Sequence, residues 1–169
     1  MLVPDYSNRD YWKAIILYGL NNATYKIALG KALLELAGRD VTHVPWNVLS
    51  EEFLKQYKNR LDKAVMPQQT NPSRQTVMER IVNQFNHGLL TWTEAVDRVG
   101  TDAFNDVIPR FHNIVRDGEF AKDKFYEFQP NHQIIIKDSL FDILQDRPDE
   151  LFEEIDARWG LLEGAFLIN

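Results

Sequence analysis

Apolar residues recur with helical spacing along most of this chain, and the most regular stretch covers residues 21–37. Its large apolar residues follow at spacings of four, four and three, which places them on one face of a helix: Tyr25, Leu29, Leu33 and Leu36. Asn21 or Asn22 can cap its start, and Gly38 is a stop signal after the last apolar residue. Gly30 costs about 1 kcal/mol relative to alanine in an exposed helix, so we expect another element to pack closely there. The pattern therefore predicts a central, buried helix.

Seven further stretches show helical spacing or capping signals. They are residues 8–19, 46–64, 74–87, 91–99, 101–114, 139–144 and 149–168. Ser7 or Asn8 can cap the first of these helices, and Thr91 forms a capping-box pattern with Glu94. In the last helix the spacing alternates by three and four, which predicts a continuous apolar row of Phe152, Ile155, Trp159, Leu162 and Phe166. We expect Pro109 to divide or kink the 101–114 segment.

The period changes after residue 124, where two short strand-like runs cover residues 125–129 and 133–137. Pro130, Asn131 and His132 join them, so a β-hairpin is expected at about 125–137. Residues 38–44 are expected to form a loop. The sequence thus predicts a mainly α protein, a multi-helix, bundle-like single domain over residues 1–169 with one small β-hairpin.

Composition limits the class of protein. The chain is 44% hydrophobic and 26% charged, as is usual for a globular protein, and no apolar run approaches the roughly 18 residues of a membrane span. The N-terminus lacks the basic start and apolar run of a secretory signal. There are no cysteines, which excludes disulfides, thiol nucleophiles and cysteine-ligated metals. These features favour a cytoplasmic location and no contact with a membrane.

The charge is divided unevenly between the two halves of the chain. Residues 1–90 hold eleven Lys and Arg against eight Asp and Glu, whereas residues 91–169 hold eight against seventeen. A polyanion would therefore be bound by the first half, and the second half suits a protein partner better.

The basic candidates gather on the predicted 46–64 helix and the loop after it. They are Lys55, Lys58, Arg60, Lys63 and Arg74. These cations could contact DNA phosphates weakly, with steep salt dependence and no sequence preference. The alternative is that they form the solvated outer face of a helix.

The acidic candidates lie on the predicted last helix, and they are Glu153, Glu154 and Asp156. We expect them to face solvent, where they could bind a partner protein. Acidic residues near the start of a helix also interact favourably with the helix dipole and improve solubility, which is the alternative explanation.

No catalytic or metal centre is predicted. The four histidines have no paired spacing, and the chain has neither a Gly-x-Ser-x-Gly elbow nor a glycine-rich phosphate loop. The hairpin followed by a helix has the element order of ββα-metal nucleases. However, His132 lies in the turn, and residues 139–146 contain no histidine or asparagine that could bind a metal. We therefore expect no cofactor.

Three segments carry a family resemblance. They are residues 23–37 (ATYKIALGKALLELA), 107–112 (VIPRFH) and 157–166 (ARWGLLEGAF). In this order they resemble the helical N-terminal region of bacterial HNH endonuclease-domain proteins, many of which are associated with restriction or phage defence. The resemblance covers nearly the whole chain. It implies that residues 1–169 form the N-terminal domain of a longer protein whose nuclease module follows the last helix, and none of the matched segments is catalytic.

Two functional hypotheses follow. The first is a non-catalytic accessory module of a DNA-processing or anti-phage defence system, which positions a nuclease on DNA or docks it to a partner. The alternative is a protein–protein interaction module that uses the acidic second half and contacts no nucleic acid.

Overall fold

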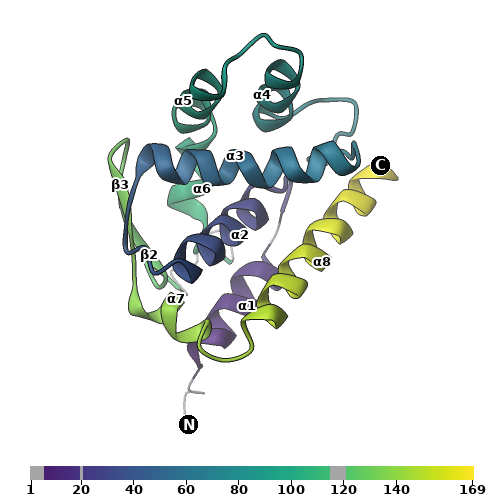
Figure 1. Ribbon diagram of the computed structural model, residues 1–169. Helices are drawn as coiled ribbons and strands as arrows, with labels where there is room; N and C mark the ends of the chain where they lie inside the picture. The colour runs from purple at the N-terminus through teal and green to yellow at the C-terminus, as the bar shows by residue number, and fades with distance from the viewer. Residues whose placement is uncertain (1–5, 20, 115–120) are drawn as a thin grey trace.

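A computed structural model describes residues 6–19, 21–114 and 121–169 of the chain (Figure 1). In these ranges eight helices and one three-stranded sheet follow in the order α1 (Asn8–Tyr18), α2 (Tyr25–Gly38), β1 (His43–Pro45), α3 (Trp46–Lys63), α4 (Val77–Asn86), α5 (Trp92–Asp102), α6 (Phe104–Arg110), β2 (Tyr126–Gln129), β3 (Gln133–Ile136), α7 (Asp138–Ile143) and α8 (Pro148–Leu167). The predicted mainly α single domain is confirmed. The first five residues, where no secretory signal is expected, lie outside the described ranges.

Helix α2 is the centre of the fold (Figure 1). It packs against α3 on one side and α8 on another, with α6, α7 and α1 completing its surroundings. The predicted row is buried at Leu29, Leu33 and Leu36, but Ile27 and Leu34 on other sides of the helix are equally buried. The sequence predicted burial of a single apolar face, but α2 is buried on more than one face because other helices enclose it on several sides.

Gly30 makes the close approach that its position in the middle of α2 predicts. A Cβ atom built there would lie 2.8 Å from Ile155 Cδ1 of α8 and 2.9 Å from Ile16 Cδ1 of α1. Both distances are shorter than van der Waals contact, so the missing side chain allows three helices to meet at one point.

Local sequence signals determine most of the helix ends. Ser7 and Thr91 form capping boxes with Asp10 and Glu94, as their spacing suggests. Thr76 forms a third capping box, so α4 begins at residue 77 rather than at the predicted residue 74. The predicted 101–114 helix is also interrupted at another place. Helix α5 ends and α6 begins on either side of residue 103, and Pro109 lies inside α6 instead of dividing the helix.

The sheet has three strands, whereas the predicted hairpin has only two. Strands β2 and β3 pair antiparallel at 125–137 as expected, with Asn131 in the left-handed region (φ 63°) at the turn. Strand β1, which overlaps the end of the 38–44 segment expected to be a loop, pairs antiparallel with β3, with Val44 opposite Ile134. Three residues that end in a proline are too few to show an alternating pattern, so only the pairing reveals this strand.

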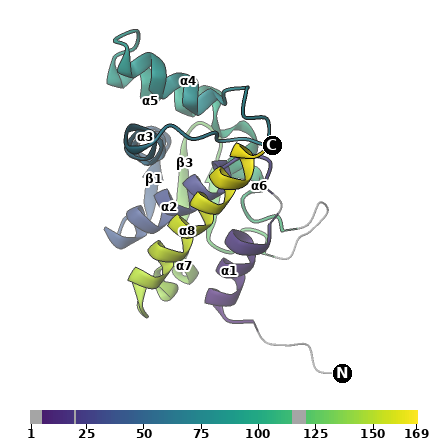
Figure 2. The same ribbon diagram turned by 90° about the vertical axis from the view of Figure 1, so that its right-hand side faces the viewer.

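The elements form layers around α2 and α3. The α4–α5 pair covers the side of α3 opposite α2, and the sheet closes the end where α3 begins (Figure 1). Helix α8 lies at the surface in front of α2 when the molecule is turned by 90° (Figure 2). Among the described residues, no helix has the length and apolar character needed to cross a membrane.

The contact at Gly30 gives a stability test. We expect Gly30→Ala to destabilise the protein by about 1–3 kcal/mol in chemical denaturation, because the added methyl group overpacks Ile155 and Ile16. Gly38→Ala is the matched control, since no heavy atom lies within 4 Å of a Cβ built there. If both substitutions stabilise the helix alike, the close approach is absent.

Candidate functional site

The last helix is anchored by the apolar row that its sequence predicts. Ile155, Trp159 and Phe166 are buried against the core, and Leu162 is nearly so. Leu151 replaces the half-buried Phe152 as the first buried residue of the row. This anchoring fixes which side of α8 faces the solvent.

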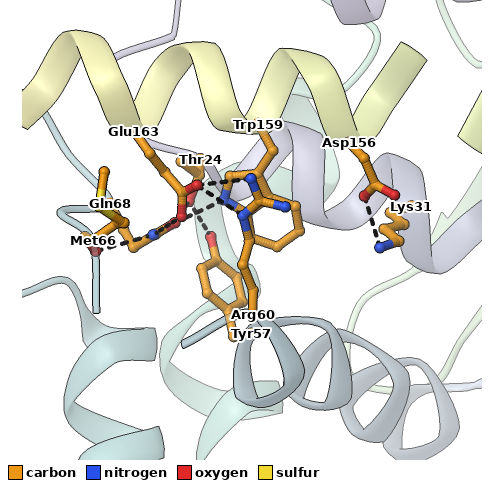
Figure 3. A network of polar contacts seen from close by, with 9 residues as sticks. All are labelled: Thr24, Lys31, Tyr57, Arg60, Met66, Gln68, Asp156, Trp159 and Glu163. Atoms are coloured by element: carbon orange, nitrogen blue, oxygen red, sulfur yellow. Dashed lines mark hydrogen bonds and ion pairs between the residues drawn. The ribbon is translucent and has the colours of Figure 1, made fainter. Parts of the chain in front are cut away.

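A buried polar network holds the C-terminal half of α8 (Figure 3). Gln68, from the loop after α3, has no exposed surface, and its carboxamide makes four hydrogen bonds. Its Oε1 accepts from Trp159 Nε1 at 2.8 Å and from Thr24 Oγ1 at 2.7 Å. Its Nε2 donates to Glu163 Oε2 at 2.6 Å and to Met66 O at 3.1 Å. Every donor and acceptor site of the amide is therefore satisfied.

The network continues into α3 through Tyr57. The Thr24 hydroxyl gives its only proton to Gln68, so the Tyr57 hydroxyl donates to Thr24 Oγ1 across 2.7 Å. Burial raises the pKa of Tyr57 well above its usual value, which keeps the phenol protonated as this role requires. Thr24 also donates its backbone N–H to Gln68 O at 3.1 Å, which ties the loop to the start of α2.

Arg60, one of the predicted DNA-binding residues, belongs to this network. Its Nε and Nη2 both donate to Glu163 Oε1, at 2.9 and 2.7 Å, and its guanidinium lies 4.6 Å from the Trp159 ring centroid. The Glu163 side chain is only 6% exposed, so Arg60 supplies the counter-charge that a buried carboxylate needs. In this structure Arg60 joins α3 to α8 rather than facing solvent.

The other four basic candidates divide into two groups. Lys55 pairs with Glu51 at 3.6 Å, and Lys58 pairs with Asp62 at 2.5 Å. Lys63 and Arg74 are exposed, and the described residues place no carboxylate within ion-pair distance of either. Two cations of the predicted five therefore remain open to a ligand.

The acidic candidates also have different roles. Asp156 forms an ion pair with Lys31 of α2 at 2.7 Å, and Glu154 pairs with Lys13 of α1 at 3.7 Å. These two pairs hold α8 against its neighbours. Glu153 is exposed, and no cation of the described residues lies within ion-pair distance of it.

The surface that sequence reasoning missed is the outer face of the second half of α8. It consists of Ala157, Gly160, Leu161, Gly164 and Ala165 together with Ile168, the residue that follows the helix, and all six are exposed. Leu161 is 67% and Ile168 is 86% exposed, and neighbouring Leu167 is 57% exposed. Figure 2 looks onto this side of the molecule and shows α8 in front. We call these six residues the outer face of α8. Their i, i+4 spacing is visible in the sequence, but the larger apolar residues of the buried row also have helical spacing and give the stronger signal.

The described residues contain no group of three side chains that could together bind a metal ion. His132 is exposed at the hairpin turn, on the rim of an open cleft of about 530 Å³ between α3 and α5. His112 is buried, where its Nε2 accepts the backbone N–H of Phe125 at 3.1 Å. Burial, and secondarily Lys137 and Lys26, lower its pKa to about 3, so it is a neutral structural acceptor.

The chain matches no model of a known protein family, and no curated protein and no solved structure was found to be similar to it. These comparisons therefore assign no function to the chain.

The Gln68 network predicts a large effect of a single amide. Gln68→Ala leaves Trp159 Nε1 and one Glu163 oxygen without their buried partner, so we expect a loss of about 2–4 kcal/mol in the free energy of unfolding. Gln75→Ala is the control, because Gln75 is exposed on the same loop. A loss below about 0.5 kcal/mol for Gln68→Ala would contradict the network.

The burial of His112 predicts acid sensitivity. Its pKa is about 3 in the folded state and 6.5 in the unfolded state, so the unfolded chain binds a proton first as the pH falls. Stability should therefore drop by about 2 kcal/mol between pH 7 and pH 5. In urea denaturation His112→Gln should remove this slope, while His132→Gln, at an exposed position, should keep it.

Proposed function

We propose that this chain is a non-catalytic interaction module that docks onto a protein through the outer face of α8. The observation that carries the proposal is the exposure of Leu161 and Ile168 on a helix whose opposite side is firmly anchored. Leu161 and Ile168 are seven residues apart and so share one side of the helix, and exposed apolar side chains that gather on one side are a feature of protein-binding sites. Glu153, one turn before this face, adds a charge that a basic group on the partner can meet.

Of the three predicted acidic contacts, this proposal keeps only Glu153. Glu154 and Asp156 are engaged with Lys13 and Lys31, so they support the position of α8. Glu153 remains as the acidic contact of the docking surface. The resemblance to HNH endonuclease-domain proteins suggests the setting, in which the module docks a nuclease subunit of a restriction or phage-defence system to its partner.

DNA binding is the second candidate, and the exposed Lys63 and Arg74 favour it. Because three of the five basic candidates already have carboxylate partners, few phosphate contacts remain. Two contacts would give a slope of only about −2 in a plot of log K against log salt concentration. Such binding would position a nuclease weakly, in addition to the protein contact.

The test of the docking function compares two matched substitutions. Leu161→Glu places a charge on the outer face of α8, and Leu89→Glu does the same at another exposed leucine, after α4. We expect a protein that co-purifies with the wild type to be retained by Leu89→Glu and lost with Leu161→Glu. Equal retention by both variants would contradict docking through α8.

The DNA candidate is tested in parallel by mobility shift of duplex and single-stranded DNA at low ionic strength. A shift that Lys63→Glu weakens, and that fades as salt is added, would support it. No shift with either form of DNA would leave the protein-docking function as the whole proposal.

A further inference from the structure

Opposite charges flank the outer face of α8 at its two ends. Asp149 and Glu153 are exposed on the first turns of the helix. At the other end, Asn169 Nδ2 donates to Thr70 O at 2.7 Å, which places the loop after α3 next to the C-terminus. This loop carries the exposed Arg74, and Figure 2 shows it passing the end of α8. Arg147, just before the helix, pairs with Glu150 at 3.2 Å. Among the described residues, the exposed charges without an ion-pair partner along α8 therefore run from acidic, at Asp149 and Glu153, to basic, at Arg74.

The position of Arg74 is restrained by its own backbone. Its N–H donates to Asn71 O at 3.1 Å, and its carbonyl oxygen accepts from Gln69 Nε2 at 2.5 Å. The same loop is held to α8 by the buried carboxamide of Gln68. The basic group thus has a defined place relative to the apolar face.

This order is self-complementary when two copies of α8 lie antiparallel. Take a two-fold axis midway between Gly160 and Gly164, at the level of Leu162. Glu153 then lies about 14 Å on one side of the axis and Asn169 about 10 Å on the other, at 1.5 Å per residue. Arg74 belongs to the loop that the Asn169–Thr70 hydrogen bond holds at this end of α8, so the arrangement brings the partner's loop, with its Arg74, toward Glu153. The same contact is repeated by symmetry.

The apolar residues meet at the centre of this arrangement. Leu161 lies only about 3 Å along the helix from its symmetry mate, and Gly160 is level with the partner's Gly164, so the glycines allow the two helices to approach closely. Neither glycine is required within one chain, since a Cβ at Gly164 would meet no heavy atom within 4 Å and one at Gly160 only Arg60 Nη2 at 3.6 Å. A parallel pair would instead place Glu153 next to the partner's Glu153, which is unfavourable.

We propose that the occupant of the outer face of α8 is a second copy of this chain, in an antiparallel two-fold dimer held by the Leu161 face and two Glu153–Arg74 pairs. The proposal rests on the proposed docking function and names its partner.

The first test measures mass by sedimentation velocity from about 1 to 100 µM, the range expected of a small interface. Wild-type protein should sediment as a dimer at the upper end. Gly164→Leu should be monomeric there, with the dissociation constant raised at least about tenfold, because its side chain has free space in the monomer but separates the helices of the dimer. Gly38→Leu, at another open glycine, should dimerise like the wild type.

The second test exchanges the charges. Glu153→Arg alone and Arg74→Glu alone should each weaken the dimer, and the two together should restore it. Asp97→Arg, at an exposed acid on α5, should have no effect. Restoration by the double variant identifies the antiparallel pairing, since general changes in net charge would not produce it.

The outcomes separate the two proposals. If the wild-type chain is monomeric from about 1 to 100 µM, the dimer is overturned. Docking to another protein is then decided by the comparison of Leu161→Glu with Leu89→Glu. A dimer that is unaffected by Gly164→Leu and by both charge reversals also overturns the proposal, because its interface lies elsewhere.

Discussion

The carboxamide of Gln68 is the interaction on which the arrangement of the helices depends. It is the point where the start of α2, the loop after α3 and α8 meet, because it bonds to Thr24, Trp159 and Glu163 at once. The apolar row of α8 determines which side of the helix faces the core, but hydrophobic burial has little directionality. Four satisfied hydrogen bonds at one buried amide add directional contacts that favour a single register for this helix. The exposed face of α8 follows from the two together.

The helices could be predicted because their signals are local. Capping boxes at Ser7 and Thr91 and the three-to-four spacing of apolar residues lie within a few residues of the structure they specify. Strand β1 could not be predicted, because it exists only through pairing with a strand about 90 residues later. The full burial of α2 was missed for a related reason: how many neighbours enclose a helix depends on the tertiary arrangement, whereas its own sequence shows only that it is apolar.

The roles of the charged residues also depend on long-range contacts that the local sequence does not show. Arg60 and Lys63 are one turn apart and look alike in sequence, yet Arg60 neutralises a buried glutamate, whereas Lys63 is exposed with no carboxylate of the described residues within ion-pair distance. Likewise Asp156 joins α8 to α2, while Glu153 faces solvent. Whether a surface charge is available to a ligand depends on long-range partners, so a local cluster of lysines and arginines overstates the binding capacity of a surface.

Glycine provides the clearest contrast between what the fold requires and what it does not. Gly30 is required, because Ile155 and Ile16 occupy the space of its side chain. Gly160 and Gly164 are unfavourable in an exposed helix, and no neighbouring atom of the described residues comes closer than 3.6 Å to a Cβ built at either. They share one face with Leu161, which is 67% exposed. The proposed interface would cover these residues, which gives a role to glycines that the packing of the described residues leaves unexplained.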